Sequence, residues 1–508
     1  MLQKVATTGV DLDSVYDQTL QRIREQKGGR SRLGIEVLMW VSHAERPLGI
    51  DELRYALAVE TDSTNLDPDN IPPQETVIGS CLGLAVVEQE TSTVRLIHYT
   101  LQEYLSQPGV LPGAHRALGE TCLTYLNYAQ VKALPVDDIT NLGGMPFLGY
   151  SSLCWGGHAK MELSDRAKSL ALELLNRYDG HISASLLFHK MHPGYRIPLP
   201  HPIFTGLHCA CYFGIDEAVA ALIEMGGCDL NQADSKGYTP LMWASRQGNQ
   251  GVVRLLFTYD DVDPEGPGGP WGETPLSAAS SQGRECVMRL LLARDDVDPD
   301  KPDNTGHTPL WWASFYGHEG AVRLLLARDD VDPDKPDVSN QTPLMIASCR
   351  GHEGVMRLLF ARDDVGPDKL GYRGRTPLWY ASDDGREGAV KLLLARDDVN
   401  PDTPDENNRT PLSAASSRGH EGVMRLLLAR DDVDPNKPDN SGQTPLWWAS
   451  YKGHEGAVRL LLARGDVNPD WSNNDGQTPL VIASSHGHMG VVELLRPRTA
   501  TIPSTDDA

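Results

Sequence analysis

The sequence has 508 residues, of which 40% are hydrophobic and 23% charged, a composition typical of a folded chain long enough for several domains. Acidic residues outnumber basic ones by 69 to 46, which gives a formal net charge of -23. This charge repels nucleic-acid phosphates and anionic lipids, so neither is an expected partner. The apolar runs are too short to span a bilayer and the first residues lack a signal-peptide core, so we expect a cytoplasmic protein.

The cysteines are scattered along the chain and form no C-x-x-C pair. We therefore predict neither a zinc site nor a disulfide framework, and a reducing compartment fits this usage. Most of the cysteines are expected to be small buried hydrophobic residues.

The first 110 residues alternate between helical and β-rich patterns. Amphipathic or apolar helices are predicted at residues 15–26, 33–41, from 47 onward, 77–82 and 98–105. Residues 84–87 and 93–97 are β-rich runs on either side of a polar turn, which indicates a hairpin. Helices followed by a two-stranded wing predict a winged helix over residues 31–110, preceded by a lead helix within residues 1–30. A helical linker domain is expected over residues 111–202.

The charge of the predicted winged helix decides between two roles for it. Residues 31–110 contain four arginines, no lysine and twelve acidic residues. Binding to DNA needs cations against the phosphates, so the sequence favours a structural role. A nucleic-acid-binding regulator remains the alternative.

From residue 203 onward the sequence repeats. The dipeptide Thr-Pro recurs with a spacing of 35 residues once and 34 residues six times, at Thr239, Thr274, Thr308, Thr342, Thr376, Thr410, Thr444 and Thr478. Thr205-Gly206, one period earlier, begins a degenerate first copy. A fixed period of this length is typical of repeat arrays. We predict nine repeats over residues 203–495 and a disordered tail over residues 496–508.

Each repeat has the pattern of two short helices. In the repeat that begins at Thr308, this threonine is a helix N-cap and Pro309 fills the first helical position. Gly317 ends the first helix, and an apolar second helix follows over residues 321–326. Neither helix can bury its apolar face alone, so the repeats must stack on one another.

A longer period of 68 residues is superimposed on the first. The Thr308, Thr376 and Thr444 repeats carry W-[WY]-A-S, whereas the repeats between them carry S-A-A-S or M-I-A-S. We infer tandem duplication of a pair of repeats. The alternation predicts that large side chains of one repeat pack against small ones of the next.

The repeats resemble the ankyrin repeat, whose T-P-L-H-x-A-A-x-x-G-H core they match closely over about the last 290 residues. The usual His after T-P-L is replaced here by Trp, Met, Ser or Val. We therefore expect its hydrogen bond to be missing and apolar packing to substitute. The resemblance implies that the His of each Gly-His-Glu string is structural, not part of a catalytic array or a metal site.

The resemblance also implies a partner-binding surface. In ankyrin stacks, protein partners usually lie on the concave face built from hairpin tips and first helices. Carried over by position, the variable positions here include Arg375 at a tip and Arg418 and Lys452 at helix ends. Aromatic residues and arginines dominate binding hot spots. We therefore predict a partner-binding set made up of Trp271, Phe315, Tyr316, Arg350, Tyr372, Arg373 and Tyr451.

The acidic A-R-D-D-V-D-P-D loops lie at the opposite edge of each repeat. Their spacing lacks the Gly and the terminal Glu of an EF-hand loop, which makes calcium binding the weaker interpretation. We expect solvated turns that also cap the preceding helix. Binding of basic partners is the other interpretation.

The N-terminal region resembles the winged helix that follows the NACHT module in NLR-like signalling ATPases, notably fungal NACHT–ankyrin proteins. The strings YDQTLQRI, LMWVSHAERPLGIDELRYALAV and VRLIHYTLQEYL carry this resemblance. In that family a His in an I-H-x-x-x-Q-E-[FY] string reaches the β-phosphate of bound ADP, and His98 matches it. The sequence contains no phosphate-binding loop, so His98 is expected to be a structural residue at a helix start. A relic nucleotide sensor, or a contact to a NACHT module in trans, is the alternative.

Together these patterns predict a mainly all-α chain with a winged-helix and helical domain before an ankyrin-repeat solenoid. No G-x-S-x-G or H-E-x-x-H motif occurs, and we predict a non-enzymatic scaffold without cofactor or metal. The solenoid is expected to recognise a protein partner, and the N-terminal region to couple to a NACHT-type signalling module. A subunit or fragment of a nucleotide-driven oligomer is a further alternative, because the sequence starts where this family has its ATPase module.

Overall fold

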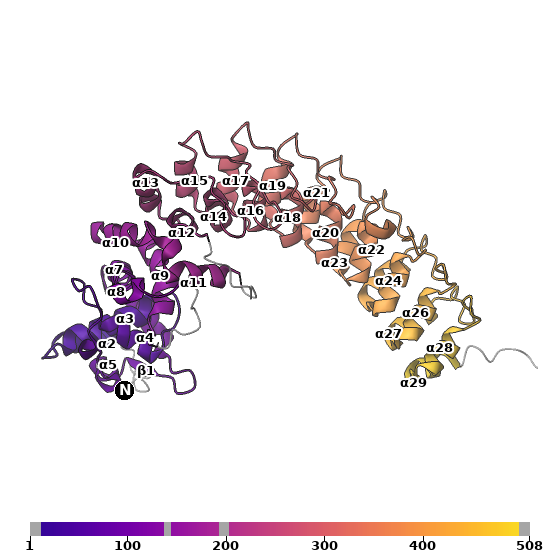
Figure 1. Ribbon diagram of the computed structural model, residues 1–508. Helices are drawn as coiled ribbons and strands as arrows, with labels where there is room; N and C mark the ends of the chain where they lie inside the picture. Colours follow the sequence, from indigo (N-terminus) through magenta and orange to yellow (C-terminus); the bar gives the residue numbers. More distant parts are fainter. Residues whose placement is uncertain (1–11, 137–143, 193–202, 497–508) are drawn as a thin grey trace, which may run out of the picture. The chain divides into compact units, whose positions relative to one another are not determined.

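The computed structural model describes residues 12–136, 144–192 and 203–496 (Figure 1). The chain divides into two compact units, Met1–Asp263 (unit 1) and Pro264–Ala508 (unit 2). Helices dominate both units, and one two-stranded sheet is the only sheet among the described residues. The mainly all-α fold class is therefore confirmed. Within the described ranges, no helix is long and apolar enough to cross a membrane. Residues 497–508 of the predicted tail lie outside the described residues.

Unit 1 begins with the winged helix. Its β-hairpin was predicted correctly, and Ala85 pairs with Leu96 and Val87 with Val94 in antiparallel register. Three helices begin three residues earlier than predicted, at Leu12, Arg30 and Gln74. The helix predicted from residue 47 begins at Ile50. The elements are α2 (Leu12–Arg24), α3 (Arg30–His43), α4 (Ile50–Leu57), η1 (Pro68–Asn70), α5 (Gln74–Ser80), β1 (Ala85–Val87), β2 (Val94–Leu96) and α6 (Tyr99–Leu105).

Helix α3 forms the centre of the winged helix. Val37 and Leu38 on this helix are fully buried. A Cβ at Gly34 would lie 2.6 Å from the carbonyl oxygen of Ser80, so α3 and the end of α5 approach closely only because residue 34 is glycine.

A helical region follows the winged helix in unit 1. Trp40 of α3 makes edge contacts with Phe147 and Tyr150, at ring-centroid distances of 5.4 and 5.6 Å. Tyr150 shares a hydrogen bond of 2.8 Å with His158 Nε2, and burial lowers the pKa of His158 to about 4. The helices are α7 (Ala114–Leu126), α8 (Ala129–Lys132), α9 (Leu148–Met161), α10 (Asp165–Leu175), η2 (Tyr178–Gly180) and α11 (Ile182–Met191).

Two helix pairs complete unit 1, at the positions of the first two predicted repeats: α12 (Gly206–Phe213) with α13 (Asp216–Glu224), and α14 (Pro240–Gln247) with α15 (Gln250–Leu256). The degenerate first copy keeps the His that the later repeats have lost. His208 Nδ1 lies 2.8 Å from Thr205 Oγ1, and its Nε2 lies 2.9 Å from the carbonyl oxygen of Gln232. This histidine ties the start of α12 to the loop that follows α13.

Unit 2 consists of seven further helix pairs in its described part. In each pair a Thr caps the first helix and a Pro occupies its first turn, as predicted. First helices contact first helices of neighbouring repeats, and second helices contact second helices, so unit 2 has two layers (Figure 1). The pairs are α16 (Pro275–Ser281) and α17 (Glu285–Leu292), α18 (Pro309–Tyr316) and α19 (Glu319–Leu326), α20 (Pro343–Arg350) and α21 (Glu353–Leu359), α22 (Pro377–Asp383) and α23 (Glu387–Leu394), α24 (Pro411–Arg418) and α25 (Glu421–Leu428), α26 (Pro445–Lys452) and α27 (Glu455–Leu462), and α28 (Pro479–Ser485) and α29 (Met489–Leu495); η3 (Tyr372–Gly374) lies in the loop before α22.

The histidines of the Gly-His-Glu strings are structural, as expected. His352 Nε2 lies 3.1 Å from the carbonyl oxygen of Phe315 in the preceding repeat, and His454 makes the same contact to Ser417 at 3.2 Å. Arg386 stands at the equivalent position of another repeat and donates from Nε to the carbonyl oxygen of Cys349. Each contact satisfies a carbonyl group at the end of a first helix.

The predicted packing of large against small side chains is confirmed in part: the large residues of α22 pack with an alanine of the next repeat but also with a methionine of the preceding one. Trp379 and Tyr380 of α22 form one buried cluster with Met345 of α20 and Ala414 of α24. The expected loss of the family's histidine hydrogen bond is also confirmed. The indole Nε1 atoms of the tryptophans that replace it are buried and without a hydrogen-bond partner, at Trp311, Trp379 and Trp447.

The acidic loops differ from the prediction. The carboxylates do not cap the preceding helix; Asp300 Oδ2 instead accepts a hydrogen bond of 2.6 Å from Asp332 N in the next repeat. The same link recurs along unit 2, for example from Asp434 N to Asp402 Oδ2. The helix ends are capped by arginine, because Arg328 Nη1 donates to the carbonyl oxygen of Leu292. The loops therefore connect neighbouring repeats through carboxylate-to-backbone hydrogen bonds.

The cysteine prediction holds in large part. All eight cysteines are free thiols, and five of them are buried. Cys228 and Cys286 are exposed instead, and half-buried Cys349 donates a hydrogen bond of 3.0 Å to Asp384.

Candidate protein-recognition surface

Two exposed positions of the repeat behave differently when the repeats are compared. The middle of the second helix carries a basic residue in all but the last repeat of unit 2, and this residue forms an i,i+4 ion pair in several of them, for example Arg425 with Glu421 at 2.7 Å. The two residues at the end of the first helix, of which the second is the C-cap in three repeats, instead read Ser-Gln, Phe-Tyr, Cys-Arg, Asp-Asp, Ser-Arg, Tyr-Lys and Ser-His. Side chains therefore vary along the layer of first helices and the loop tips before them, which we call the first-helix face.

Three of the predicted partner-binding residues lie together on this face. The guanidinium of Arg350 lies 4.1 Å from the ring centroid of Phe315, a cation–π geometry. Phe315 also stacks on Trp311 at 5.3 Å, so its ring is held between two repeats' side chains. The adjacent Tyr316 is 47% exposed. This cluster presents an aromatic platform whose side chains are already ordered by packing.

Two other predicted residues lie at one loop tip. Tyr372 is 50% exposed, and the guanidinium of Arg373 lies 5.2 Å from its ring centroid. Arg373 has a φ of 59°, in the left-handed region that residues other than glycine rarely adopt. Gly374 provides the positive φ at the position where the other repeats have Gly or Asn, so Arg373 is an additional left-handed residue in this loop.

The remaining two predicted residues stand apart from these groups. Trp271, 53% exposed, lies in the loop before α16, and its carbonyl oxygen accepts a hydrogen bond of 2.8 Å from Asn304 N. Tyr451 is half-buried at the end of α26, stacked on Trp447 at 5.3 Å. The predicted set is thus several separate anchors along the first-helix face.

A pocket of about 580 Å³ on this face was not predicted from the sequence. Its basic lining residues are Arg375, Arg409, Arg418 and Lys452, with Asp383 as the acidic one. The variable positions named from the sequence included all the basic residues except Arg409, but none was selected for the partner-binding set. The sequence does contain a signal for this pocket: Arg375 and Arg409 occupy the same position, directly before Thr-Pro, in consecutive repeats.

His307 occupies this same position in an earlier repeat. Its Nδ1 lies 3.4 Å from Asp303 and its Nε2 3.6 Å from Asp337 of the next repeat, while its ring stacks on Trp311 at 3.7 Å. Burial lowers the pKa of His307, but the attraction of the two neighbouring carboxylates outweighs burial and raises it to about 9. His307 is therefore a cation at neutral pH.

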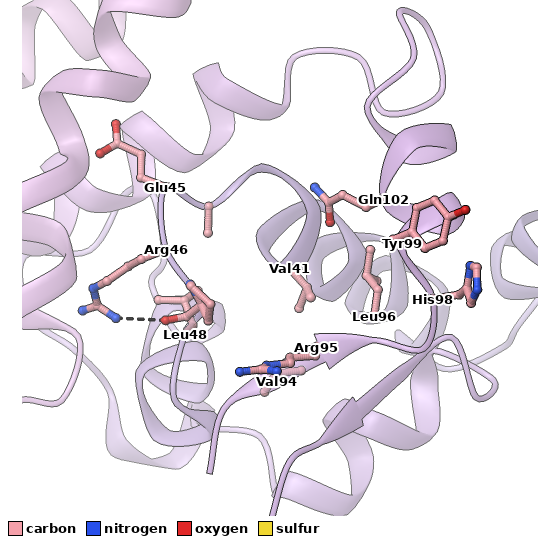
Figure 2. A pocket seen from close by; sticks show the side chains of 12 residues that line it. Val41, Glu45, Arg46, Leu48, Val94, Arg95, Leu96, His98, Tyr99 and Gln102 are labelled. Carbon is pink, nitrogen blue, oxygen red and sulfur yellow. Dashed lines mark hydrogen bonds between the residues drawn. The ribbon is translucent and has the colours of Figure 1, made fainter. Parts of the chain in front are cut away.

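His98 lies in unit 1, at the edge of a pocket of about 410 Å³ in the winged helix (Figure 2). Its Nδ1 accepts a hydrogen bond from Thr100 N at 3.2 Å, so His98 is the N-cap of α6, as expected. Figure 2 shows Val41 and Leu96 in the middle of the pocket, with His98 beyond Tyr99. Tyr99 is 70% exposed, the most exposed large hydrophobic residue of the winged helix.

The arginines of the winged helix bear on the nucleic-acid alternative. All four within residues 31–110 are in ion pairs with nearby carboxylates: Arg32 with Glu36, Arg46 with Glu52, Arg54 with Asp51 and Arg95 with Glu88. These cations are therefore already neutralised locally, which disfavours contacts with phosphate groups. In the parts of the chain that the structure describes, no group of three or more His, Cys, Asp or Glu residues is placed to hold a metal ion.

Comparison with known proteins gives two family matches. The family described as "Ankyrin repeats (3 copies)" matches residues 185–267, 260–337, 330–405, 397–470 and 431–506. The family "GPI inositol-deacylase, winged helix domain" matches residues 18–112. These matches agree with the repeats and the winged helix seen in the structure.

Two individual proteins are similar over shorter stretches. The photoreceptor ankyrin repeat protein of Homo sapiens is 44% identical over 55 residues, which is 11% of this chain and only 12% of that protein. The crystal structure of the ankyrin repeat domain of Bcl-3, a member of the IkappaB protein family, is 28% identical with a TM-score of 0.39, covering 44% of this chain and 99% of that one. Because the ankyrin family matches extend over well over half of the sequence, this chain belongs to the ankyrin-repeat proteins.

Proposed function

We propose that this protein is a non-catalytic scaffold that binds a protein partner through the first-helix face of unit 2. The observation that carries the proposal is the contrast between the two exposed positions of the repeat. Both are accessible to solvent in most repeats of unit 2, and both descend from repeats that we infer to be duplicated. The second-helix position keeps a basic residue in all but the last repeat, whereas the first-helix position has diversified into aromatic, basic and acidic side chains.

The chemistry of the diversified side chains supports a protein ligand. Tyr, Trp and Arg are the residues that contribute most binding energy in protein interfaces. The Phe315–Arg350 pair is held by its own packing, so little side-chain entropy would be lost when a partner binds. Such ordered anchors are suited to recognition by a rigid surface.

We further propose a domain order in which the winged helix (residues 31–110) and a helical linker (residues 111–202) precede nine ankyrin repeats (residues 203–495). The N-terminal part would couple recognition to a NACHT-type signalling module. The pocket beside His98 and the exposed Tyr99 support an apolar contact there. Calorimetry with a separately supplied NACHT module tests this coupling, and no heat dependent on Tyr99 or His98 would reject it.

The recognition function is tested by quantitative affinity capture with the full chain. The variant Phe315→Ser, Tyr316→Gln, Tyr451→Ser replaces each residue with one that a sister repeat carries at that position, which favours retention of the fold. Proteins enriched by the wild-type chain should be lost with this variant. The matched control is Arg289→Gln, Arg357→Gln, Arg459→Gln, which changes exposed second-helix positions and should retain them. Equal enrichment by all three chains would refute the proposal.

A further inference from the structure

The pocket between the Thr376, Thr410 and Thr444 repeats is basic in a strongly acidic protein. Four cationic side chains line it: Arg375, Arg409, Arg418 and Lys452. Arg418 is paired with Asp383 at 3.2 Å, and Arg375 and Arg409 each lie 3.7 Å from a carboxylate, so Lys452 is the lining cation without an ion pair among the described residues. The whole chain carries a net charge of -23. Basic side chains gathered at one place on such a chain favour an anionic ligand there.

The repeats depart from their own pattern to build this pocket. The residue before Thr-Pro is arginine in two consecutive repeats, at Arg375 and Arg409. Arg418 and Lys452 end the first helices of consecutive repeats in the same way. Elsewhere the residue before the first-helix threonine is Phe204, Tyr238, Glu273, His307, Gln341, Gln443 or Gln477.

The two arginines are positioned but not saturated with hydrogen bonds. Arg375 lies 3.8 Å from the ring centroid of Trp379, and Arg409 lies 4.2 Å from that of Trp448. Behind Arg375, Asp405 Oδ2 is 3.7 Å from Nε, a separation too long for a hydrogen bond, and Asp439 is equally far from Arg409. Both Nε atoms are buried without a hydrogen-bond partner. A ligand cannot reach these buried Nε atoms, but the side chains of Arg375 and Arg409 are 21% and 35% exposed, and their Nη groups make no hydrogen bond to a described residue.

Two further donors in the lining lack acceptors. Trp379 is 3% exposed, and its indole Nε1 is buried without a hydrogen-bond partner. Lys452 forms no ion pair with any described residue, and its ammonium group lies 4.8 Å from the ring centroid of Tyr451. The buried Nε1 is common to the equivalent residues Trp311 and Trp447, whereas the ammonium group of Lys452 is exposed and can donate to the acceptor oxygens of a ligand.

We propose that this pocket binds an acidic peptide segment, with side-chain carboxylates or phosphates as the anions that its arginines and Lys452 recognise. The inference deepens the proposed recognition function and rests on it. A volume of about 580 Å³ accommodates several side chains, and Tyr451 next to Lys452 provides an aromatic contact beside the charged site. The planar, forked guanidinium groups match the geometry of both anions.

The test uses the full chain and fluorescein-labelled decapeptides that differ only at two central positions, which are Ser, Glu or phosphoserine. The acidic peptides should bind saturably and weaken as salt is raised, and the Ser peptide should not bind. Tighter binding of the phosphoserine peptide than of the Glu peptide identifies phosphate as the preferred anion, and the reverse identifies carboxylate. Free inorganic phosphate should compete only weakly, because it lacks the peptide's other contacts.

Substitutions in the pocket test whether the acidic peptides bind there. Arg375→Gln, Arg409→Gln installs the residue found at this position in three sister repeats and should weaken acidic-peptide binding by about tenfold or more. The single variant Lys452→Ala, at an exposed residue, should weaken it less and serves if the double variant does not fold. The matched control Arg425→Gln, Arg459→Gln removes the same charge from second helices of neighbouring repeats and should bind like the wild type.

The proposal is overturned if neither acidic peptide binds saturably, if the Ser peptide binds as well, or if the pocket variants bind as tightly as the control. If the peptides fail while affinity capture still depends on Phe315, Tyr316 and Tyr451, protein recognition stands and only its acidic ligand is wrong. Failure of both experiments removes the recognition function as well.

Discussion

The helical region of unit 1 and the repeats of unit 2 are held together in different ways. In unit 1, one aromatic cluster joins residues more than a hundred positions apart, with Trp40 packed on Phe147 and Tyr150. In unit 2, the side-chain links join equivalent positions of adjacent repeats, such as His352 with the carbonyl oxygen of Phe315. The contacts that stabilise the helical region of unit 1 are therefore concentrated in one cluster, whereas those of unit 2 are spread over the interfaces between adjacent repeats. Because no single interface between repeats carries all of the stability, individual exposed positions of a repeat can change without loss of the fold. The proposed recognition residues lie at such positions.

The largest effect is expected for Phe147→Ala in unit 1. Phe147 is fully buried, and its removal leaves a cavity in the aromatic cluster, which should cost about 3–5 kcal/mol. Hydrogen-exchange mass spectrometry should show faster exchange across α3, α7 and α9. The amides of α20–α27 in unit 2 should exchange as in the wild type. Equal loss of protection in both units would show that the stability of unit 2 depends on the aromatic cluster of unit 1.

A pH effect is expected in unit 2 from His307. Its pKa is raised to about 9 in the folded chain, from its ordinary value of 6.5. The stabilisation is therefore fully present below about pH 6.5 and is lost as the pH rises through about 9. Because the side chain is partly exposed, we expect a loss on the order of 2 kcal/mol, measured by denaturant unfolding between these pH values.

The variant His307→Gln is the control, since sister repeats carry Gln at this position. This variant should remove most of the pH dependence of the free energy of unfolding that His307 causes in the repeats around α18. If the variant and the wild type lose stability in parallel, another group is responsible.

A smaller, local effect is expected for Thr410→Ala. Thr410 Oγ1 accepts a hydrogen bond of 3.1 Å from Ser413 N at the start of α24. Loss of this N-cap should cost about 1 kcal/mol. Faster hydrogen exchange should be confined to α24, α25 and the adjoining repeats. A change that reaches α16 at one end of unit 2 as strongly would show that its stability is not distributed.

The smallest effect is expected for Arg430→Gln. Arg430 Nη1 donates to the carbonyl oxygen of Leu394 at 3.0 Å and its Nη2 pairs with Asp432 at 2.7 Å, but both side chains are solvent-accessible. We expect a loss of about 0.5 kcal/mol, detectable as faster exchange at the end of α23. A loss several times larger would show that this arginine has a greater structural role than its exposure indicates.

The regular parts of both units were predictable because their signals are local. The Thr-Pro dipeptides fix the start of each first helix, and a polar turn between two β-rich runs fixes the hairpin. The histidine contacts were predictable from the family resemblance. In all of these cases, the residues that determine the structure lie close together in the sequence or recur with its period.

The contacts that were missed depend on distance in three dimensions. Nothing near His158 in the sequence indicates that it shares a hydrogen bond of 3.0 Å with His115, which lies on another helix. The link from Asp332 N to Asp300 runs between loops of different repeats, so the loop sequence alone suggested a helix cap instead. The basic pocket needs side chains from three repeats, and only stacking brings Arg375, Arg418 and Lys452 to one place.

Hydrogen exchange of the full chain, with and without the partner obtained by affinity capture, tests the central claim most directly. The account predicts slower exchange at the ends of the first helices α18, α20, α22, α24 and α26 and at the loop that contains Tyr372. Exchange in the second helices α19, α21, α23, α25 and α27 should not change. Protection centred on those second helices, or confined to unit 1, would contradict it.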